Sequence, residues 1–265
     1  MTDPAEITVR PLSETVAVIA GGTSGIGLES AAQLAEARVP HLLLAGRDRS
    51  KGTAAIDTIQ ARAPAAELRF FSGDLSDPQA AAGMAAEASA AFGRIDLLFN
   101  SPGGNDLPRL FKDIPLEEVA GIAGRGMFPV LNACRAVWDG MVAEGGGVII
   151  NMASDAAKIA TPGESVIGAS LAGVAMFTRG LAIEGKRNGI RANCLTPSIV
   201  RGTPLYDRLM AAPFSGKLFA KAEQAARLGV VTPADIAPLV VFLASPAAAK
   251  LTGQAISVNG GISAA

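Results

Sequence analysis

The stretch TVAVIAGGTSGIGLES, residues 15–30, constrains the fold most, because it places a strand, a glycine-rich turn and a helix start in direct succession. A helix N-terminus offers unpaired N–H groups and the positive end of its dipole, which together attract phosphate. Here Gly21 would permit the tight turn, Gly25 would let the backbone approach a pyrophosphate, and Gly27 would let helix and strand pack closely. The spacing Gly-x-x-x-Gly-x-Gly differs from the usual dinucleotide fingerprint Gly-x-Gly-x-x-Gly, so a purely structural turn is the alternative.

Apolar runs of strand length alternate with longer alanine-rich segments of helical pattern along the chain. Because the runs are hydrophobic on both faces, they suit a parallel sheet that is covered on both sides. The alternation predicts an α/β fold, a Rossmann-like doubly wound parallel sheet of about seven strands flanked by helices. We expect an N-terminal extension over residues 1–12 and one domain over 13–265, since no linker or repeat divides the chain. The predicted strands are 15–20, 41–45, 67–71, 95–100, 147–153, 190–195 and 255–260.

Charge and composition exclude several functional classes. The formal net charge of −1 gives no electrostatic reason to expect nucleic acid or an anionic membrane as a partner. No uninterrupted apolar run approaches the ~20 residues of a membrane span, and the polar start MTDPAEITVRPL resembles neither a signal nor a transit peptide. For Cys134 and Cys194, two buried free thiols are favoured over a disulfide. These features predict a cytoplasmic protein that takes a small-molecule substrate or ligand.

The end of the second predicted strand indicates which dinucleotide would bind. A NAD site needs an acidic residue for the ribose 2′-hydroxyl, whereas an NADP site needs an arginine for the 2′-phosphate. The strand ends LLLAGRD, with Gly46 at its tip and Arg47 next. NADP(H) is therefore favoured over NAD(H), with a merely solvated Arg47 beside Asp48 as the alternative reading.

Six motifs in order resemble those of the short-chain dehydrogenase/reductase family. They are AGGTSGIG (20–27), GDLSD (73–77), GRIDLLFNSPGG (93–104), GGGVIINMAS (145–154), NGIRANCLTPS (188–198) and LTGQAISVNGG (251–261). The resemblance runs from about residue 13 to the end and implies homodimers or homotetramers that use helices four and five as interfaces. It implies cofactor contacts at Gly21, Thr23, Ser24, Gly25, Ile26, Gly27, Arg47, Asp74, Leu75, Asn100, Pro197 and Thr203.

The same resemblance implies a catalytic serine, tyrosine, lysine and asparagine, of which only the serine is present. NMAS supplies Ser154, and the usual interval of 13 residues leads to Ile167 at the tyrosine position and Leu171 at the lysine position. The asparagine position falls on Gly126, or on Ala123 if the alignment shifts, and Asn132 lies too far along the helix. Ser154 either still donates a hydrogen bond to a ligand or only terminates the strand. The chain also departs from the family in the neighbouring stretches Asn100–Ser101–Pro102–Gly103 and Pro197–Ser198.

Other polar residues near the predicted cleft were considered as replacements, each with a simple surface or loop role as the alternative. They are Tyr206, Lys158, Asp155, Asn105 and Asp106. His41, the sole histidine, begins the second strand at the far edge and is not expected to be catalytic. Without a second histidine or a Cys/His cluster, we predict no metal site.

Two functional hypotheses follow from this pattern, because isoleucine and leucine cannot carry a proton. General acid–base catalysis contributes about 10²–10⁴-fold, so ordinary ketone reduction should be nearly abolished. The first hypothesis is an atypical NADP(H)-dependent oxidoreductase that acts on a cationic or strongly polarised acceptor, such as an iminium or activated alkene. The second is a catalytically silent protein that binds NADP(H) or another ligand as a sensor or assembly subunit. Nothing in the sequence favours non-redox chemistry such as isomerisation, dehydration or cyclisation.

Overall fold

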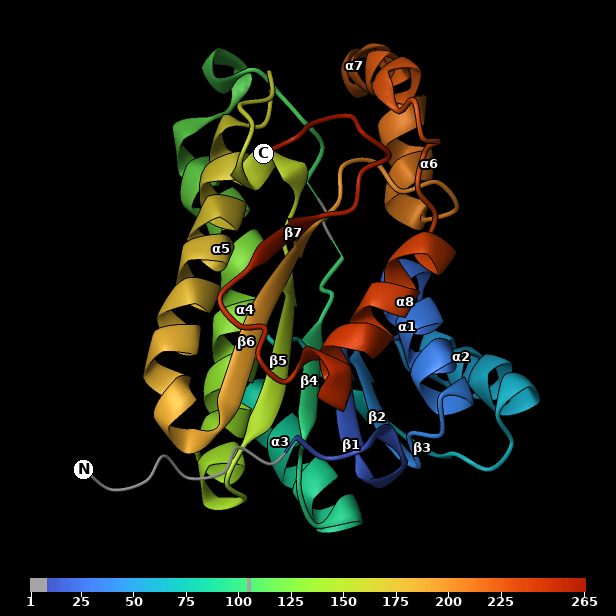
Figure 1. The fold of residues 1–265 in the computed structure, drawn as a ribbon. Coiled ribbons are helices and arrows are strands. Elements are labelled where there is room, and N and C mark those ends of the chain that lie inside the picture. Colours follow the sequence, from blue (N-terminus) through green and yellow to red (C-terminus); the bar gives the residue numbers. More distant parts are fainter. Residues whose placement is uncertain (1–8, 104–105) are drawn as a thin grey trace.

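The alternating strands and helices form a parallel sheet of order β3-β2-β1-β4-β5-β6-β7 in the computed structural model, which describes residues 9–103 and 106–265 (Figure 1). The predicted doubly wound α/β fold is thereby confirmed. The strand order reverses between β1 and β4, and ligands of such sheets bind beyond the carboxyl ends of the strands at this point. The strands are β1 Val16–Ala20, β2 His41–Gly46, β3 Glu67–Ser72, β4 Leu97–Asn100, β5 Gly147–Met152, β6 Ile190–Thr196 and β7 Ala255–Ser257.

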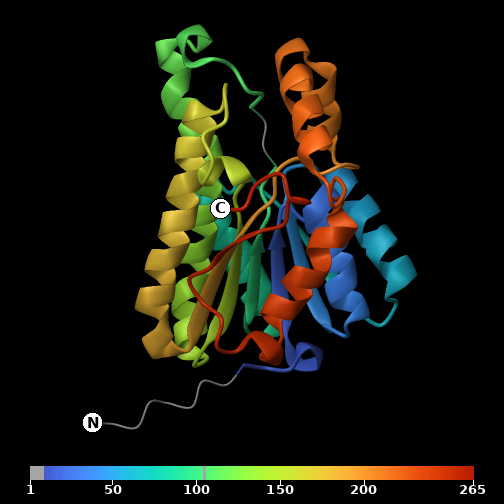
Figure 2. The ribbon, with the colours of Figure 1, turned by 45° about the horizontal axis from the view of Figure 1, so that its top comes forward.

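Helices cover both faces of this sheet. Side chains alternate along β1, so Ile19 enters one apolar core and Val18 the other. The first core is closed by α1, α2 and α8, and the second by α3, α4 and α5, while α6 and α7 project above the carboxyl ends of the strands (Figure 2). The helices are α1 Gly25–Glu36, α2 Arg49–Arg62, α3 Pro78–Phe92, α4 Leu116–Ala143, α5 Ser165–Gly185, α6 Pro204–Ala211, α7 Pro213–Ala225 and α8 Pro233–Ala244.

Local sequence explains where several helices begin. Asp48 accepts hydrogen bonds from the backbone N–H groups of Ser50 and Lys51 at the start of α2. Asp77 does the same for Gln79 at the start of α3, which has a proline in its first turn. Acceptor side chains at these positions satisfy N–H groups that the helix itself leaves unpaired.

Helix α5 is apolar enough to pass a membrane-span criterion. The most apolar 18 residues between Ser165 and Asn188 have a mean hydropathy of 1.6, although the sequence contains no uninterrupted apolar run of that length. Val174, Thr178 and Ala182 are buried within the fold, whereas Met176 and Ile183 are exposed. The hydropathy of α5 therefore arises from an apolar buried side together with apolar residues on its outer side.

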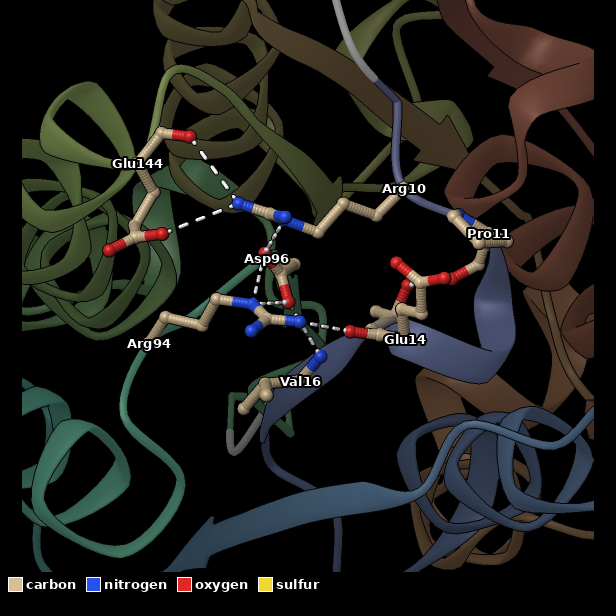
Figure 3. Close-up of polar contacts among 8 residues, drawn as sticks. Arg10, Pro11, Glu14, Val16, Arg94, Asp96 and Glu144 are labelled. Atoms are coloured by element: carbon tan, nitrogen blue, oxygen red, sulfur yellow. Dashed lines mark hydrogen bonds and ion pairs between the residues drawn. The ribbon is translucent and has the colours of Figure 1, made fainter.

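A buried carboxylate joins the end of the N-terminal segment to the sheet at the amino ends of the strands (Figure 3). Asp96 accepts hydrogen bonds from the Arg10 guanidinium at 2.8 Å, the Arg94 guanidinium at 3.0 Å and the Val16 backbone N–H at 2.8 Å. Arg10 also reaches the carboxylate of Glu144 at 3.3 Å. The predicted N-terminal extension, 1–12, is thus docked onto the sheet at Arg10, and residues 1–8 lie outside the described part of the chain.

Candidate cofactor and active site

The glycine-rich turn between β1 and α1 leaves no room for side chains at two positions. Gly21 has a φ of +83°, and a Cβ built on it would lie 2.1 Å from the carbonyl oxygen of Ser101. A Cβ on Gly27 would lie 2.2 Å from the carbonyl oxygen of Gly21. The turn is therefore pressed against the end of β4 on one side and against the first turn of α1 on the other.

The first turn of α1 is open to an anion. Ser24 occupies the position before the helix in an extended conformation, and its hydroxyl makes no capping hydrogen bond. The first N–H groups of a helix have no partner within the helix, and the dipole makes this end positive. Ile26 lies within this turn, and a Cβ on Gly25 would lie 3.2 Å from the methyl carbon of Thr203. Thr203 uses its hydroxyl locally, donating to the Val200 carbonyl and accepting from the Tyr206 N–H.

The tips of β2 and β3 bring the predicted adenosine contacts together. The methyl carbon of Thr23 lies 2.9 Å from where a Cβ on Gly46 would stand, which explains the glycine before Arg47. Asp74 accepts from the Ser76 N–H at 3.0 Å and the Ser76 hydroxyl at 2.8 Å. These bonds and the charge of Arg47 lower the pKa of Asp74, so its carboxylate stays ionised at neutral pH.

Leu75 and Asn132 link this region to α4. Leu75 is buried, and the Asn132 side chain donates to the carbonyl oxygens of Leu75 and Ser76, both at 3.0 Å. Asn132 therefore holds the loop after β3 in place.

Two asparagines meet in the core at the ends of β4 and β5. Asn100 donates to the Asn151 side-chain oxygen at 2.9 Å, and Asn151 donates to the Thr178 hydroxyl at 2.9 Å. Asn100 also contacts the Cys134 sulfur at 3.3 Å, while its own side-chain oxygen is buried without a partner. Asn100 was predicted from the sequence, whereas Asn151 and Thr178 were not, although asparagines near the ends of two neighbouring strands were a usable signal.

The predicted catalytic serine stands where β5 ends. Ser154 precedes a short 3-10 helix, η3 (Asp155–Ala157), and its hydroxyl oxygen accepts from the Ala156 N–H at 3.2 Å. Pro197, which follows β6, accepts from the Asp155 N–H at 2.7 Å. Ser154 therefore has a local capping role, and its hydroxyl hydrogen remains available to a ligand.

Helix α5 carries Ile167 and Leu171 one turn apart. Leu171 packs against the core between α5 and the sheet, and Ile167 is half-buried near the start of the helix. Between them Ser170 is buried and donates to the Ala123 carbonyl of α4 at 2.7 Å. A Cβ on Gly126 would lie 2.6 Å from the Ser170 hydroxyl oxygen, so Ser170 fills the space in front of position 126.

Most of the polar residues near the predicted cleft have other partners. The Tyr206 hydroxyl donates to Glu223 at 2.6 Å, and Asp106 pairs with Arg125 at 2.6 Å. Lys158 donates to the Ser257 hydroxyl at 2.6 Å, and Asp155 accepts from the Ser263 hydroxyl at 2.7 Å. Asn105 lies outside the described residues.

His41, which is not expected to be catalytic, lies apart from these positions. His41 stacks on Phe92 at the opposite edge of the sheet, with ring centroids 5.0 Å apart. Cys134 and Cys194 are free and buried, as predicted, and burial raises the pKa of each thiol to about 12. Within residues 9–103 and 106–265, no group of three or more His, Cys, Asp or Glu side chains could hold a metal ion.

One carboxylic acid that the sequence analysis missed lies in this region. Glu164 immediately precedes α5, and burial together with the negative charge of Asp155 raises its pKa to about 7. A hydrogen bond from Thr161 opposes this rise only in part. A carboxyl group that exchanges its proton near neutral pH is suited to acid–base chemistry.

Known proteins resemble this chain over nearly its whole length. A family model described as Enoyl-(Acyl carrier protein) reductase matches residues 20–263. The short-chain reductase protein NovJ of Streptomyces niveus is 32% identical, over 98% of this chain and 99% of its own. A probable 2,4-dienoyl-CoA reductase of Bacillus subtilis is also 32% identical, over 94% of this chain and 97% of its own.

A solved structure of another protein has a similar fold. An NADPH-bound short-chain oxidoreductase of Pseudomonas aeruginosa, described as containing an atypical catalytic center, superposes with a TM-score of 0.87 at 28% identity. The match covers 96% of this chain and 99% of that one. Family model, relatives and fold agree, and the chain therefore belongs to the short-chain dehydrogenase/reductase family of oxidoreductases.

Proposed function

We propose that this protein is an atypical NADP(H)-dependent oxidoreductase that reduces a polarised acceptor without the family's tyrosine–lysine pair. The observation that carries the proposal is the contrast between the two halves of the site. The phosphate-binding turn keeps glycines that no other residue could replace, whereas Ile167 and Leu171 occupy the positions of the proton-carrying side chains. This contrast supports a protein that binds the cofactor but lacks the usual route for the proton.

NADP(H) is the cofactor that suits the residues at the tip of β2. Gly21 and Gly27 form a cradle that a Cβ would fill, next to the open first turn of α1. Arg47 and Asp74 are both exposed, and the fixed positive charge of Arg47 would attract a 2′-phosphate. The NADPH bound by the relative from Pseudomonas aeruginosa is in line with this assignment.

An activated alkene, such as an α,β-unsaturated thioester, is the acceptor class we favour over an iminium. Bound NADPH would supply the hydride to the β-carbon, and the thioester carbonyl would take up the resulting negative charge. The relative from Bacillus subtilis is named as a dienoyl-CoA reductase, and the matching family model is described as an enoyl reductase. Simple ketones lack this internal polarisation and depend on a strong external acid.

Binding of the two nicotinamide cofactors tests the first part of the proposal. NADPH and NADH are titrated separately against the fluorescence of Trp138 or by calorimetry, with wild-type protein, R47A and R135A. Loss of a charge-assisted contact worth about 1.5–3 kcal/mol predicts that R47A binds NADPH about 10–100-fold more weakly and NADH unchanged. Arg135 is exposed on α4 and pairs with Asp139, so R135A is a matched control for the loss of one positive charge. Equal affinities for both cofactors in wild-type protein would contradict the NADP assignment.

Turnover with a panel of acceptors tests the second part. Purified protein and NADPH are mixed with unsaturated thioesters, cyclic iminium salts and simple ketones, and NADPH oxidation is followed by its absorbance. We expect oxidation with the unsaturated thioesters and none with the ketones. NADPH binding without turnover of any acceptor would instead favour the silent sensor or assembly subunit.

We further propose that the protein forms a homodimer or homotetramer through α4 and α5. Phe128 on α4 is 53% exposed, and Met176 and Ile183 on α5 are 62% and 64% exposed. Met176 and Ile183 are seven residues apart and therefore lie on the same side of α5. Exposure of such large apolar side chains to water is unfavourable, so this side of the helix is suited to an interface. Light scattering of wild-type protein and M176R should show an oligomer and a smaller species, respectively. A monomeric wild-type protein would refute this interface.

The free buried thiols support a reducing compartment, and we propose a cytoplasmic location on that ground.

A further inference from the structure

Glu164 lies one helical turn before Ile167 on the same side of α5. Its carbonyl oxygen accepts the first helical hydrogen bond, from the Gly168 N–H at 2.5 Å. Residues three and four apart on a helix stand above one another, and the acidic residue therefore precedes Ile167 and Leu171 along one face. This face is the one that carries the tyrosine and lysine positions.

The segment around Glu164 is enclosed by three parts of the fold. A Cβ on Gly163 would lie 2.5 Å from the ring of Phe214 on α7 and 3.2 Å from Pro108. The Gly163 carbonyl accepts from the Arg109 N–H at 2.9 Å. On the inner side, a Cβ on Gly168 would lie 2.8 Å from the Ala156 carbonyl oxygen of η3. Glu164 is therefore held between the loop that follows Ser154 and the segments that cover the carboxyl ends of the strands.

Few charges act on the Glu164 carboxyl group. Asp155, on η3, contributes a negative charge, and Thr161 contributes a hydrogen bond. The covering segments place Pro108 and the Phe214 ring against the neighbouring Gly163. The Arg109 N–H donates to the Gly163 carbonyl, and the Arg109 guanidinium is paired with Glu118. Lys158, which follows η3, is directed to Ser257. Burial and Asp155 thus both favour the neutral acid, with the pKa raised to about 7.

We propose that Glu164 is the catalytic acid that replaces the family's tyrosine. The inference rests on the proposed function, because it needs NADPH as the hydride donor and an unsaturated thioester as the acceptor. Hydride adds to the β-carbon, and the electron pair of the carbon–carbon double bond moves toward the α-carbon and the thioester carbonyl. The Glu164 carboxyl group gives its proton to the α-carbon, which completes the new C–H bond and leaves a carboxylate. Solvent returns the proton to the carboxylate after each turnover.

Asp155 acts through Glu164 as a positioning residue in this scheme. Its negative charge adds to the effect of burial in raising the pKa of Glu164, and its side chain accepts a hydrogen bond from the Ser263 hydroxyl at 2.7 Å. Asparagine at position 155 can still accept the Ser263 hydrogen bond but carries no charge. D155N should therefore lower the pKa of Glu164 and leave the local packing unchanged.

The test compares wild-type protein with E164Q, D155N and the control E184Q, in which an exposed carboxylate at the other end of α5 is neutralised. Transfer of hydride in a single turnover is followed by NADPH absorbance between pH 5 and 9, and NADPH affinity is measured separately. In wild-type protein the rate should fall as pH rises through about 7. The rate of hydride transfer in E164Q should be about 10²–10⁴-fold lower than in wild-type protein and should not fall as pH rises. The NADPH affinity of E164Q should be unchanged. In D155N the rate should fall at a lower pH than in wild-type protein. E184Q should have the same rate and the same pH dependence as wild-type protein.

The outcomes separate this inference from the proposed function. If wild-type protein oxidises NADPH and E164Q keeps its rate and pH profile, Glu164 is not the acid, while the proposed function stands. If none of the tested acceptors supports NADPH oxidation by wild-type protein, both the inference and the proposed function are refuted. If E164Q fails to fold by circular dichroism, the D155N profile decides: a shift to lower pH supports the inference, and an unchanged profile overturns it.

Discussion

Replacing Glu164 by glutamine should stabilise the protein, and only at neutral and higher pH. In the folded protein the pKa of Glu164 is raised from its usual 4.5 to about 7, chiefly by burial. Between these two values the folded state binds more protons than the unfolded chain, and the free energy of unfolding therefore falls as pH rises. This loss is complete above about pH 7 and amounts to about 3 kcal/mol.

Glutamine has the shape of the neutral acid and can still accept the hydrogen bond from Thr161. Urea unfolding of wild-type protein and E164Q at pH 5 and pH 8 measures the effect. The stability difference in favour of E164Q should grow by roughly 2–3 kcal/mol between the two pH values. Every other titrating group is common to both proteins and cancels in the comparison, and E184Q should show no such growth. A difference between E164Q and wild-type protein that is the same at pH 5 and pH 8 would refute the reasoning.

Three further substitutions test the packing, each by urea unfolding. Gly21→Ala puts a Cβ 2.1 Å from the Ser101 carbonyl oxygen at a φ of +83°, and we expect a loss of about 2 kcal/mol together with loss of NADPH binding; a variant that binds normally contradicts this. Asn151→Ala leaves buried polar groups of its two neighbours unpaired and should destabilise by about 3 kcal/mol, whereas a loss below about 1 kcal/mol would show that water replaces the amide. Asp96→Ala leaves Arg10 and Arg94 without their shared carboxylate and should destabilise by about 3 kcal/mol; an unchanged midpoint contradicts it.

The sheet could be predicted from the sequence because its strands are apolar on both faces. The predicted ranges 41–45, 67–71 and 190–195 each lie within one residue of β2, β3 and β6. Two strands differ by more than one residue, since 95–100 was predicted and β4 begins at Leu97, and 255–260 was predicted and β7 ends at Ser257. Asn259 there bonds to Ser263 and forms a turn, a contact between side chains that periodicity does not reveal.

The candidate site could be predicted only where a residue acts through its own backbone geometry. The role of Gly21 depends on a turn that its local sequence specifies. The pKa of Glu164 depends instead on burial in the folded protein and on the charge of Asp155 in another loop. The same limit applies to Tyr206 and Lys158, whose engagement with Glu223 and Ser257 only the fold discloses.

The space in front of Gly126, where the resemblance to the family implies its asparagine, is closed by Ser170. A Cβ at position 126 meets the Ser170 hydroxyl at 2.6 Å, and moving that hydroxyl breaks its buried hydrogen bond to Ala123. G126A alone should therefore lose about 1–3 kcal/mol. In the S170A background the clash is gone, and alanine should stabilise the helix by about 0.5–1 kcal/mol relative to glycine.

The four proteins wild type, G126A, S170A and G126A/S170A form a double-mutant cycle, measured by urea unfolding. The two substitutions should be less destabilising together than the sum of their separate effects, by at least about 1 kcal/mol. Strict additivity would show that position 126 has free space. An asparagine could then be introduced there without a second substitution at position 170. Coupling would mean that a side chain at position 126 requires a change in α5 as well. The proton donor of this protein would then have to come from elsewhere in the fold, as proposed for Glu164.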